Sequence, residues 1–157
     1  MRTVTLLKTW IVTFVASLLL FTPALEARAP ILTLNDVTIT EHDTCAVIRV
    51  KFNFPLRYVK HFPYKSGDDL RIQFDPIPIA IPPGEKSALF TRESVRPPRN
   101  DIASLIEVIY EGNVAGGPFL TLYFRHPVVF RVEQGADFRS LNIIVLGSEA
   151  SDCSRIP

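Results

Sequence analysis

A dense set of cationic and aromatic side chains lies in one short part of the chain, and it is the set best suited to binding chemistry. It comprises Arg57, Tyr58, Lys60, His61, Phe62, Tyr64, Lys65 and Arg71. Aromatic faces offer flat apolar area to a sugar ring, and cations suit the carboxylates of acidic glycans and peptides. The set therefore predicts a binding surface. A solvated turn whose rings belong to the core would give the same pattern.

Signatures of catalysis and of metal binding are absent from the sequence. It has no Gly-x-Ser-x-Gly elbow, no His-Glu-x-x-His and no phosphate-binding glycine loop. His42, His61 and His126 are far apart in the sequence, and none has a second His at metal-ligand spacing. Asp68 and Asp69 are adjacent, so their side chains should diverge rather than act as a paired acid and base. We expect no metal, no cofactor and no enzymatic activity.

A second cationic group lies in a proline-rich connection at residues 75–101. Its middle, from Ser87 to Val95, could form a short helix with Ser87 as its cap. If the connection were helical as far as Arg99, the side chains of Arg92, Arg96 and Arg99 would face one way. An ordinary solvated loop is the alternative for this segment.

Two stretches of the sequence, 71 to 72 residues apart, are similar enough to be copies of one another. The strands predicted in these copies would position the candidate binding residues. Each copy carries a Phe-x-x-Pro and then a Leu-x-Ile. The alignment places His126 where the first copy has Phe54, which predicts a packing role at a strand end. The aligned positions are Val50, Phe52, Pro55, Leu56, Tyr58, Leu70, Ile72 and Phe74 against Leu122, Phe124, Pro127, Val128, Phe130, Leu141, Ile143 and Val145.

Alternation of apolar and polar residues predicts strands in both copies. The clearest runs from Ala46 to Phe54, and others are expected at 70–74, 106–111, 118–125, 128–133 and 141–146. Turns are expected at 66–69, at 112–117 and at 134–136. No segment shows a sustained helical period. We expect an all-β chain of about seven or eight strands.

The N-terminal 29 residues resemble a secretory leader. Arg2 and Lys8 precede an apolar run that is too short for a comfortable membrane span, and small residues follow it. Cleavage is expected after Ala27, and an uncleaved anchor is the alternative. Without Arg2, Lys8 and Glu26 the chain has 15 basic and 15 acidic residues, which argues against nucleic acid as a partner. We expect a periplasmic or otherwise secreted protein that meets the membrane only through this leader.

The strand layout, with a leader followed by two sets that carry Phe-x-x-Pro and Leu-x-Ile, resembles the AMIN domain. That family supplies non-catalytic targeting modules of bacterial envelope proteins such as cell-wall amidases and secretin components. The stretches 55–63, 116–125 and 137–141 also look like leading domains of envelope proteins with tetratricopeptide repeats. The resemblance covers residues 32–146 and implies a two-sheet β-sandwich that binds peptidoglycan or an envelope protein. It fixes no binding residue.

The expected organisation is a leader at 1–29, a β domain at 30–147 and a polar tail at 148–157. A pilin-like assembly subunit would share the leader and the size, but the end of the chain lacks the alternating apolar residues that strand exchange needs. A hydrolase with an unrecognised site is the remaining alternative.

The two cysteines give a prediction of their own. An even pair in an exported protein most simply forms a disulfide, here between Cys45 and Cys153. We expect mass spectrometry of the non-reduced protein to find one cross-linked peptide pair that contains both residues. Two thiols that react with an alkylating agent would contradict it, and thiols that pair between molecules are the alternative.

Overall fold

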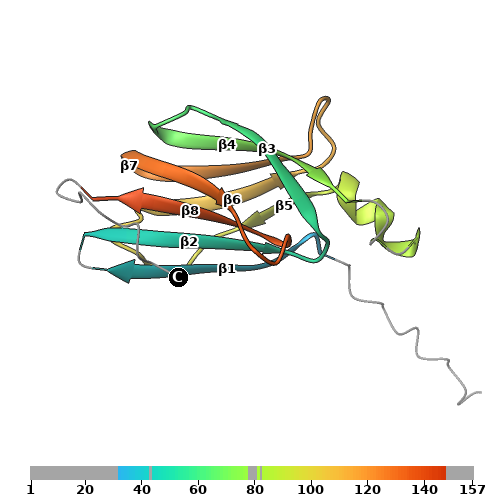
Figure 1. The fold of residues 1–157 in the computed structure, drawn as a ribbon, viewed down its shortest axis with the longest axis horizontal. Helices are drawn as coiled ribbons and strands as arrows, with labels where there is room; N and C mark the ends of the chain where they lie inside the picture. The colour runs from blue at the N-terminus through green and yellow to red at the C-terminus, as the bar shows by residue number, and fades with distance from the viewer. Residues whose placement is uncertain (1–31, 43, 78–80, 82, 148–157) are drawn as a thin grey trace, which may run out of the picture. The chain divides into compact units, whose positions relative to one another are not determined.

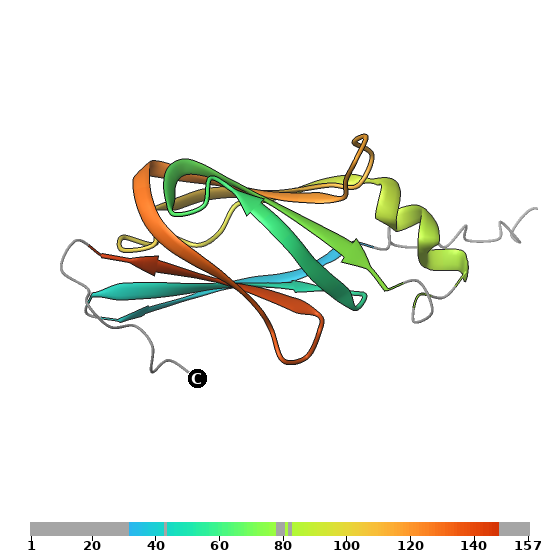
Figure 2. The same ribbon diagram turned by 45° about the horizontal axis from the view of Figure 1, so that its top comes forward.

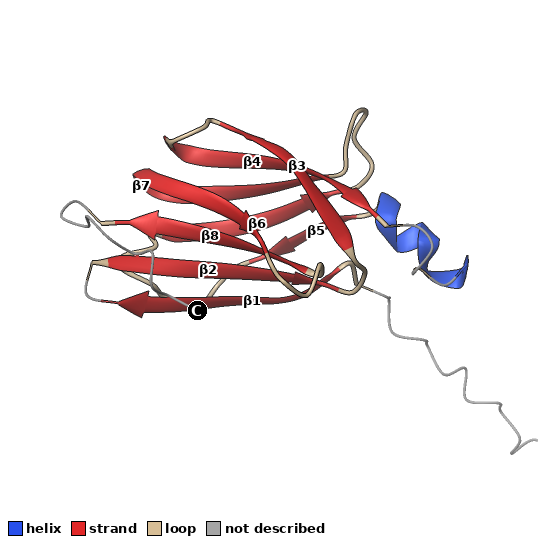
Figure 3. Ribbon diagram, in the orientation of Figure 1, coloured by secondary structure: helices blue, strands red, loops and turns tan. Residues whose placement is uncertain are grey.

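The structure is a computed structural model that describes residues 32–42, 44–77, 81 and 83–147. The expected leader, the polar tail and Cys153 lie outside the described residues, so the predictions made for them remain predictions. Within the described part, no helix is long and apolar enough to span a membrane. Strands make up most of this part, and its helical segment is the single blue element in Figure 3.

Eight strands and one short 3-10 helix are described, which confirms the all-β prediction. The elements are β1 (Leu34–His42), β2 (Cys45–Phe52), β3 (Leu56–Phe62), β4 (Ser66–Pro76), η2 (Pro83–Phe90), β5 (Arg92–Val95), β6 (Leu105–Glu111), β7 (Phe119–Gln134) and β8 (Ser140–Leu146).

All strand pairs are antiparallel and belong to one eight-stranded sheet with the order β1-β2-β8-β7-β4-β3, in which β6 also pairs with β7, and β5 with β6. The central element is β7, which is 16 residues long. It pairs with β6 over residues 119–124 and with β8 over residues 129–134, while β4 pairs with it at residues 119–123 and again at 128–129. Figures 1 and 2 show this strand curving between the two groups of partners.

Strand pairing repeats with the spacing of the two sequence copies. Val37 lies opposite Val50 in the β1–β2 ladder, and the corresponding residues Val108 and Leu122 lie opposite each other between β6 and β7. Both ladders also carry a register shift at the same place, after Leu34 in one and after Leu105 in the other. Equivalent residues of the two copies therefore have equivalent partners in their ladders, and both ladders are irregular at the same position. This confirms that the sequence repeat is also a repeat of strand pairing.

A β-bulge explains why the offset between the copies returns from 72 to 71 residues. In the first copy Tyr58 lies opposite Phe74 and Lys60 lies opposite Gln73, so Val59 is the extra residue of β3. The corresponding β7–β8 ladder runs without a register shift. One additional residue in one copy shifts every later alignment by one.

The two copies exchange strands rather than standing apart. Ile48 of β2 lies opposite Ile143 of β8, which belongs to the other copy. The equivalent pair, Leu120 of β7 and Ile72 of β4, again joins the two copies. The β2–β8 and β4–β7 ladders therefore join the two copies, in addition to the ladders that lie within each copy.

One cluster of buried apolar side chains is shared by both copies. Its centre contains Phe52 and Phe74, whose ring centroids are 5.0 Å apart, and Tyr110, which is stacked on Phe74 at 6.2 Å. Apolar residues of the strands of both copies are buried, as the alternation in their sequences implies. They include Ile48, Val50, Phe52, Ile72, Val108, Leu122, Phe124 and Ile143.

Several predicted boundaries were wrong. The strands expected at 118–125 and 128–133 are one continuous strand, β7, and the turn expected at 66–69 lies inside β4. The helix expected from Ser87 to Val95 is a 3-10 helix over Pro83–Phe90, followed by β5. The residues of β5 pair with Val108 to Glu111 along the edge of β6 that does not face β7. This long-range pairing overrides the local signals for a helix.

The turn between β7 and β8 is held by Asp137. Its carboxylate accepts hydrogen bonds from Ser140 Oγ at 2.7 Å and from Arg139 N at 2.9 Å, and it pairs with Arg49 at 3.3 Å. Burial by itself would raise the pKa of Asp137. The hydrogen bonds from Ser140 and Arg139 and the charge of Arg49 outweigh burial, so the pKa lies below its usual value.

A pH dependence follows from the lowered pKa. The stabilisation by Asp137 is fully present above the pKa of the unfolded chain, about 4, and is lost as the pH falls through the lower folded value. We expect Asp137→Asn to lower the free energy of unfolding at neutral pH. The difference between the wild type and the variant should become smaller as the pH falls. Urea unfolding across this range measures the difference, with the exposed Asp36→Asn as control. A difference independent of pH would contradict the prediction.

Candidate functional site

The predicted binding residues lie on and around the hairpin of β3 and β4, at the end of the sheet order, but strand geometry divides them between two faces. Tyr58 lies opposite Phe74 and His61 lies opposite Ile72, so these two side chains share the face of the buried core. They share it although they are three residues apart, because the bulge at Val59 inserts one residue between them.

The inward pair forms a chain of hydrogen bonds that reaches the turn. The Tyr58 hydroxyl lies 2.6 Å from His61 Nδ1, and His61 Nε2 lies 3.3 Å from the carbonyl oxygen of Tyr64. This arrangement fits a neutral imidazole that carries its proton on Nε2 and accepts at Nδ1. Burial, and then the nearby Tyr64, raise the pKa of Tyr58, so its hydroxyl keeps the proton that it donates.

Rings connect this chain to the core. The centroid of His61 lies 6.1 Å from that of Phe130 and 6.1 Å from that of Tyr64. Phe130 is in turn stacked on Phe124 at 6.2 Å. The Phe130 amide also donates to the carbonyl of Lys65 at 2.9 Å, which ties the hairpin turn to β7. The turn is therefore held in place by the body of the protein.

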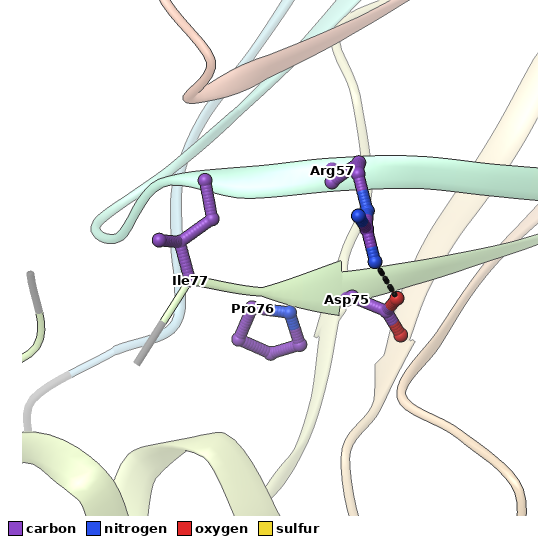
Figure 4. Close-up of a pocket in the computed structure, with 4 residues that line it drawn as sticks. All are labelled: Arg57, Asp75, Pro76 and Ile77. Carbon is purple, nitrogen blue, oxygen red and sulfur yellow. Dashed lines mark hydrogen bonds and ion pairs between the residues drawn. The ribbon is translucent and has the colours of Figure 1, made fainter. Parts of the chain in front are cut away.

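Arg57 is occupied by a neighbouring carboxylate. Its guanidinium lies 2.9 Å from Asp75, which faces it across the β3–β4 ladder. Figure 4 shows this ion pair beside Pro76 and Ile77, with which it lines a pocket of about 350 Å³. Because both charged groups are well exposed, the pair contributes little to stability. The ion pair nevertheless means that the guanidinium of Arg57 already has a carboxylate partner within the chain.

Arg71 is occupied as well. Its guanidinium lies 3.5 Å from Glu111 and 4.1 Å from the ring centroid of Phe119, a cation–π contact across β4, β7 and β6. No spacing in the sequence identifies a partner for Arg57 or Arg71, yet both are paired with a carboxylate in the structure. Both partners are set by strand register, which the sequence alone did not fix.

Four exposed side chains remain at the tip of the hairpin. The exposed fractions of Phe62 and Tyr64 are 71% and 73%, and their centroids are 6.3 Å apart in an edge-to-face arrangement. Lys60 and Lys65 are exposed on either side of them, and neither forms an ion pair within the described part of the chain. We call Lys60, Phe62, Tyr64 and Lys65 the hairpin tip.

The second cationic group does not form a helical face. Arg92 is in β5 opposite Glu111, and Arg96 and Arg99 follow the strand. All three side chains are exposed. The alternative of a solvated segment describes Arg96 and Arg99 better than the expected helix does.

One polar cluster was missed by sequence reasoning. Ser104, at a φ of 52°, places its Oγ 2.8 Å from His126 Nε2 and 3.0 Å from the carbonyl of Asp101. Glu41 Oε1 accepts hydrogen bonds from the backbone amides of residues 101, 102 and 103 at 3.0, 2.7 and 3.0 Å. These residues lie far apart in the sequence and form no recognisable motif.

This cluster is better suited to holding a loop than to catalysis. The exposed fraction of Ser104 is 1%, so a substrate cannot reach its hydroxyl, and Glu41 already occupies the amides that would stabilise an oxyanion. His126 is exposed inside β7, so the expectation of a packing residue at a strand end was wrong. Among the residues described, no three His, Cys, Asp or Glu side chains could hold a metal ion together.

Comparison with known proteins gives no match: no protein-family model, no curated protein and no solved structure resembles the chain significantly.

The chain of hydrogen bonds at Tyr58 can be tested by removing one hydroxyl. We expect Tyr58→Phe to lower the free energy of unfolding by about 1 kcal/mol, because His61 Nδ1 then lacks its donor. Urea unfolding measures this loss. Tyr64→Phe is the matched control, since it removes a hydroxyl from an exposed ring of the same hairpin. Equal stability of both variants would contradict the assigned hydrogen bond.

Proposed function

We propose that the protein is an exported, non-catalytic binding module of the bacterial cell envelope that contacts its ligand through the hairpin tip. One observation carries the proposal. Two highly exposed aromatic rings lie beside two lysines without ion-pair partners in the described part of the chain, on a turn fixed to the core.

The proposed scaffold is a two-sheet β-sandwich built from two interleaved strand sets. It is supported by the change of partners along β7, which pairs with β6 over residues 119–124 and with β8 over residues 129–134. It is also supported by the shared core, in which Phe52 of β2 and Phe74 of β4 are in contact although their strands are not paired. In such a sandwich β7 would cross from one layer to the other near His126 and Pro127.

A fixed hairpin tip suits binding because less conformational entropy is lost when a ligand arrives. The turn is held by the Lys65–Phe130 hydrogen bond and by the contacts of His61 with Tyr64. Exposed aromatic rings on a preorganised turn offer contact area at low cost. Isolated exposed apolar residues are common on protein surfaces, so the argument rests on their pairing and on the flanking lysines.

The ligand we propose is peptidoglycan, with an envelope protein as the alternative partner. Aromatic rings pack against pyranose faces, and lysine ammonium groups attract the carboxylates of the glycan and its peptides. The AMIN resemblance of the strand layout implies the same class of ligand. The near balance of acidic and basic residues favours local recognition over a broad electrostatic attraction.

Co-sedimentation with isolated peptidoglycan sacculi tests the proposal. We expect Lys60→Ala combined with Lys65→Ala to weaken binding about tenfold, equivalent to about 1.4 kcal/mol, with a smaller difference at high salt because free charges are screened. Phe62→Ala combined with Tyr64→Ala should weaken binding without that salt dependence. Both pairs are exposed, so the fold should be retained.

Arg96→Ala combined with Arg99→Ala is the matched control, because it removes the same charge from exposed positions outside the hairpin. Wild-type protein that fails to sediment would reject peptidoglycan as the ligand. Sedimentation that is weakened equally by the control and the hairpin variants would reject the hairpin tip as the site.

A further inference from the structure

A row of apolar side chains lies on the face of β2 and β8 opposite the main core. Ala46, Ile48 and Val50 point into that core, so the alternating residues of β2 point away from it. The register places Cys45 opposite Leu146 and Val47 opposite Ile144. We call Cys45, Val47, Ile144 and Leu146 the outward stripe.

Two members of the outward stripe are almost fully buried. The exposed fractions of Cys45 and Ile144 are 4% and 6%, and they form a cluster of their own with Val47 and Leu146. The described members of this cluster come only from β2 and β8. Elsewhere on the same face, Arg131 and Glu133 keep about half of their side-chain surface exposed. The near-complete burial of Cys45 and Ile144 on this face is the observation that calls for a covering segment.

The chain leaves the described region at the end of this row. The amide of Gly147 donates to the carbonyl of Thr44 at 2.8 Å, so the last described residue lies next to the residue that precedes Cys45. Residues 148–157 follow, and ten residues can extend over about 33 Å. That reach exceeds the two residue rows of the outward stripe several times over.

The segment also complements the surroundings of the row. It carries Glu149 and Asp152, and the neighbouring rows carry Arg131, opposite Ile144, and Arg49. Arg49 Nε is buried and has no hydrogen-bond partner among the described residues. Acidic residues in a covering segment would lie within the field of both arginines.

We propose that residues 148–157 fold back over the outward stripe and dock on it as a strap within the same molecule. Apolar contact would come from Ala150, Cys153 and Ile156, which recur at every third position. The strap is independent of the hairpin tip and of the ligand proposed for it. It is also compatible with, but does not require, the disulfide predicted between Cys45 and Cys153.

Photo-crosslinking in the full chain identifies the occupant directly. Val47 is replaced by p-benzoylphenylalanine, the purified protein is irradiated, and the cross-linked peptides are identified by mass spectrometry. We expect crosslinks to residues 148–157 within monomeric protein. The same replacement at Lys51, four residues further along the same strand and face, is the matched control and should give at least about threefold fewer of these crosslinks, because it lies about 13 Å away.

A second variant separates docking from tethering. In protein that carries Cys153→Ala as well as the probe at Val47, the crosslinks to residues 148–157 should persist. Adding Ile144→Ser to this protein should reduce these crosslinks at least about threefold, because burial of the isoleucine side chain contributes to docking. Crosslinks between two molecules would overturn the strap in favour of a dimer interface. Absence of crosslinks to residues 148–157, or their complete loss with Cys153→Ala, would also overturn it.

Discussion

The fold depends on one long strand that serves two ladders. β7 pairs with β6 over residues 119–124, with β8 over residues 129–134 and with β4 on both sides of the point where these partners change, so the ladders of both sequence copies meet on a single element. The buried cluster draws on residues from all of these strands. Any change that shifts the register of β7 by one residue would turn its apolar residues away from the core in both halves. The hairpin tip depends on the same strand, because Phe130 of β7 holds Lys65 and contacts His61.

Much of the fold could be predicted because a sequence repeat restricts the possible strand positions more than alternation of apolar and polar residues does. The paired Pro55 and Pro127, and the paired Ile72 and Ile143, fixed an alignment that the strand registers reproduce. The exchange of strands between copies could not be predicted in this way. Equivalent positions look the same in sequence whether each copy pairs with itself or with the other, and only the long-range ladders distinguish the two arrangements.

The candidate site was predicted in outline, but its division between two faces was not. The bulge at Val59 puts Tyr58 and His61 on one face, whereas unbroken alternation would separate residues three apart. The partners of Arg57 and Arg71 come from β4 and β6, and a spacing argument has no access to cross-strand neighbours. Lys60 and Lys65 remain as open cations because no carboxylate among the described residues pairs with them.

Two carboxylates, one near each end, join the edge strand β1 to other parts of the chain. Glu93 of β5 accepts hydrogen bonds from the amides of Thr33 and Leu34 at 2.6 and 2.9 Å, at one end of the strand. Glu41, near the other end, accepts those of residues 101 to 103. Charge-assisted hydrogen bonds to backbone amides are stronger than neutral ones.

These bonds use acidic side chains to join β1 to the segments around β5 and the start of β6. Arg57 and Arg71 are likewise paired with Asp75 and Glu111. Several of the acidic residues are thus committed to internal contacts, and the hairpin carries its unpaired positive charge at its tip. In a chain with nearly balanced charge, the hairpin thus places two lysines that have no ion pair among the described residues near Asp68 and Asp69, which are exposed and likewise form none there.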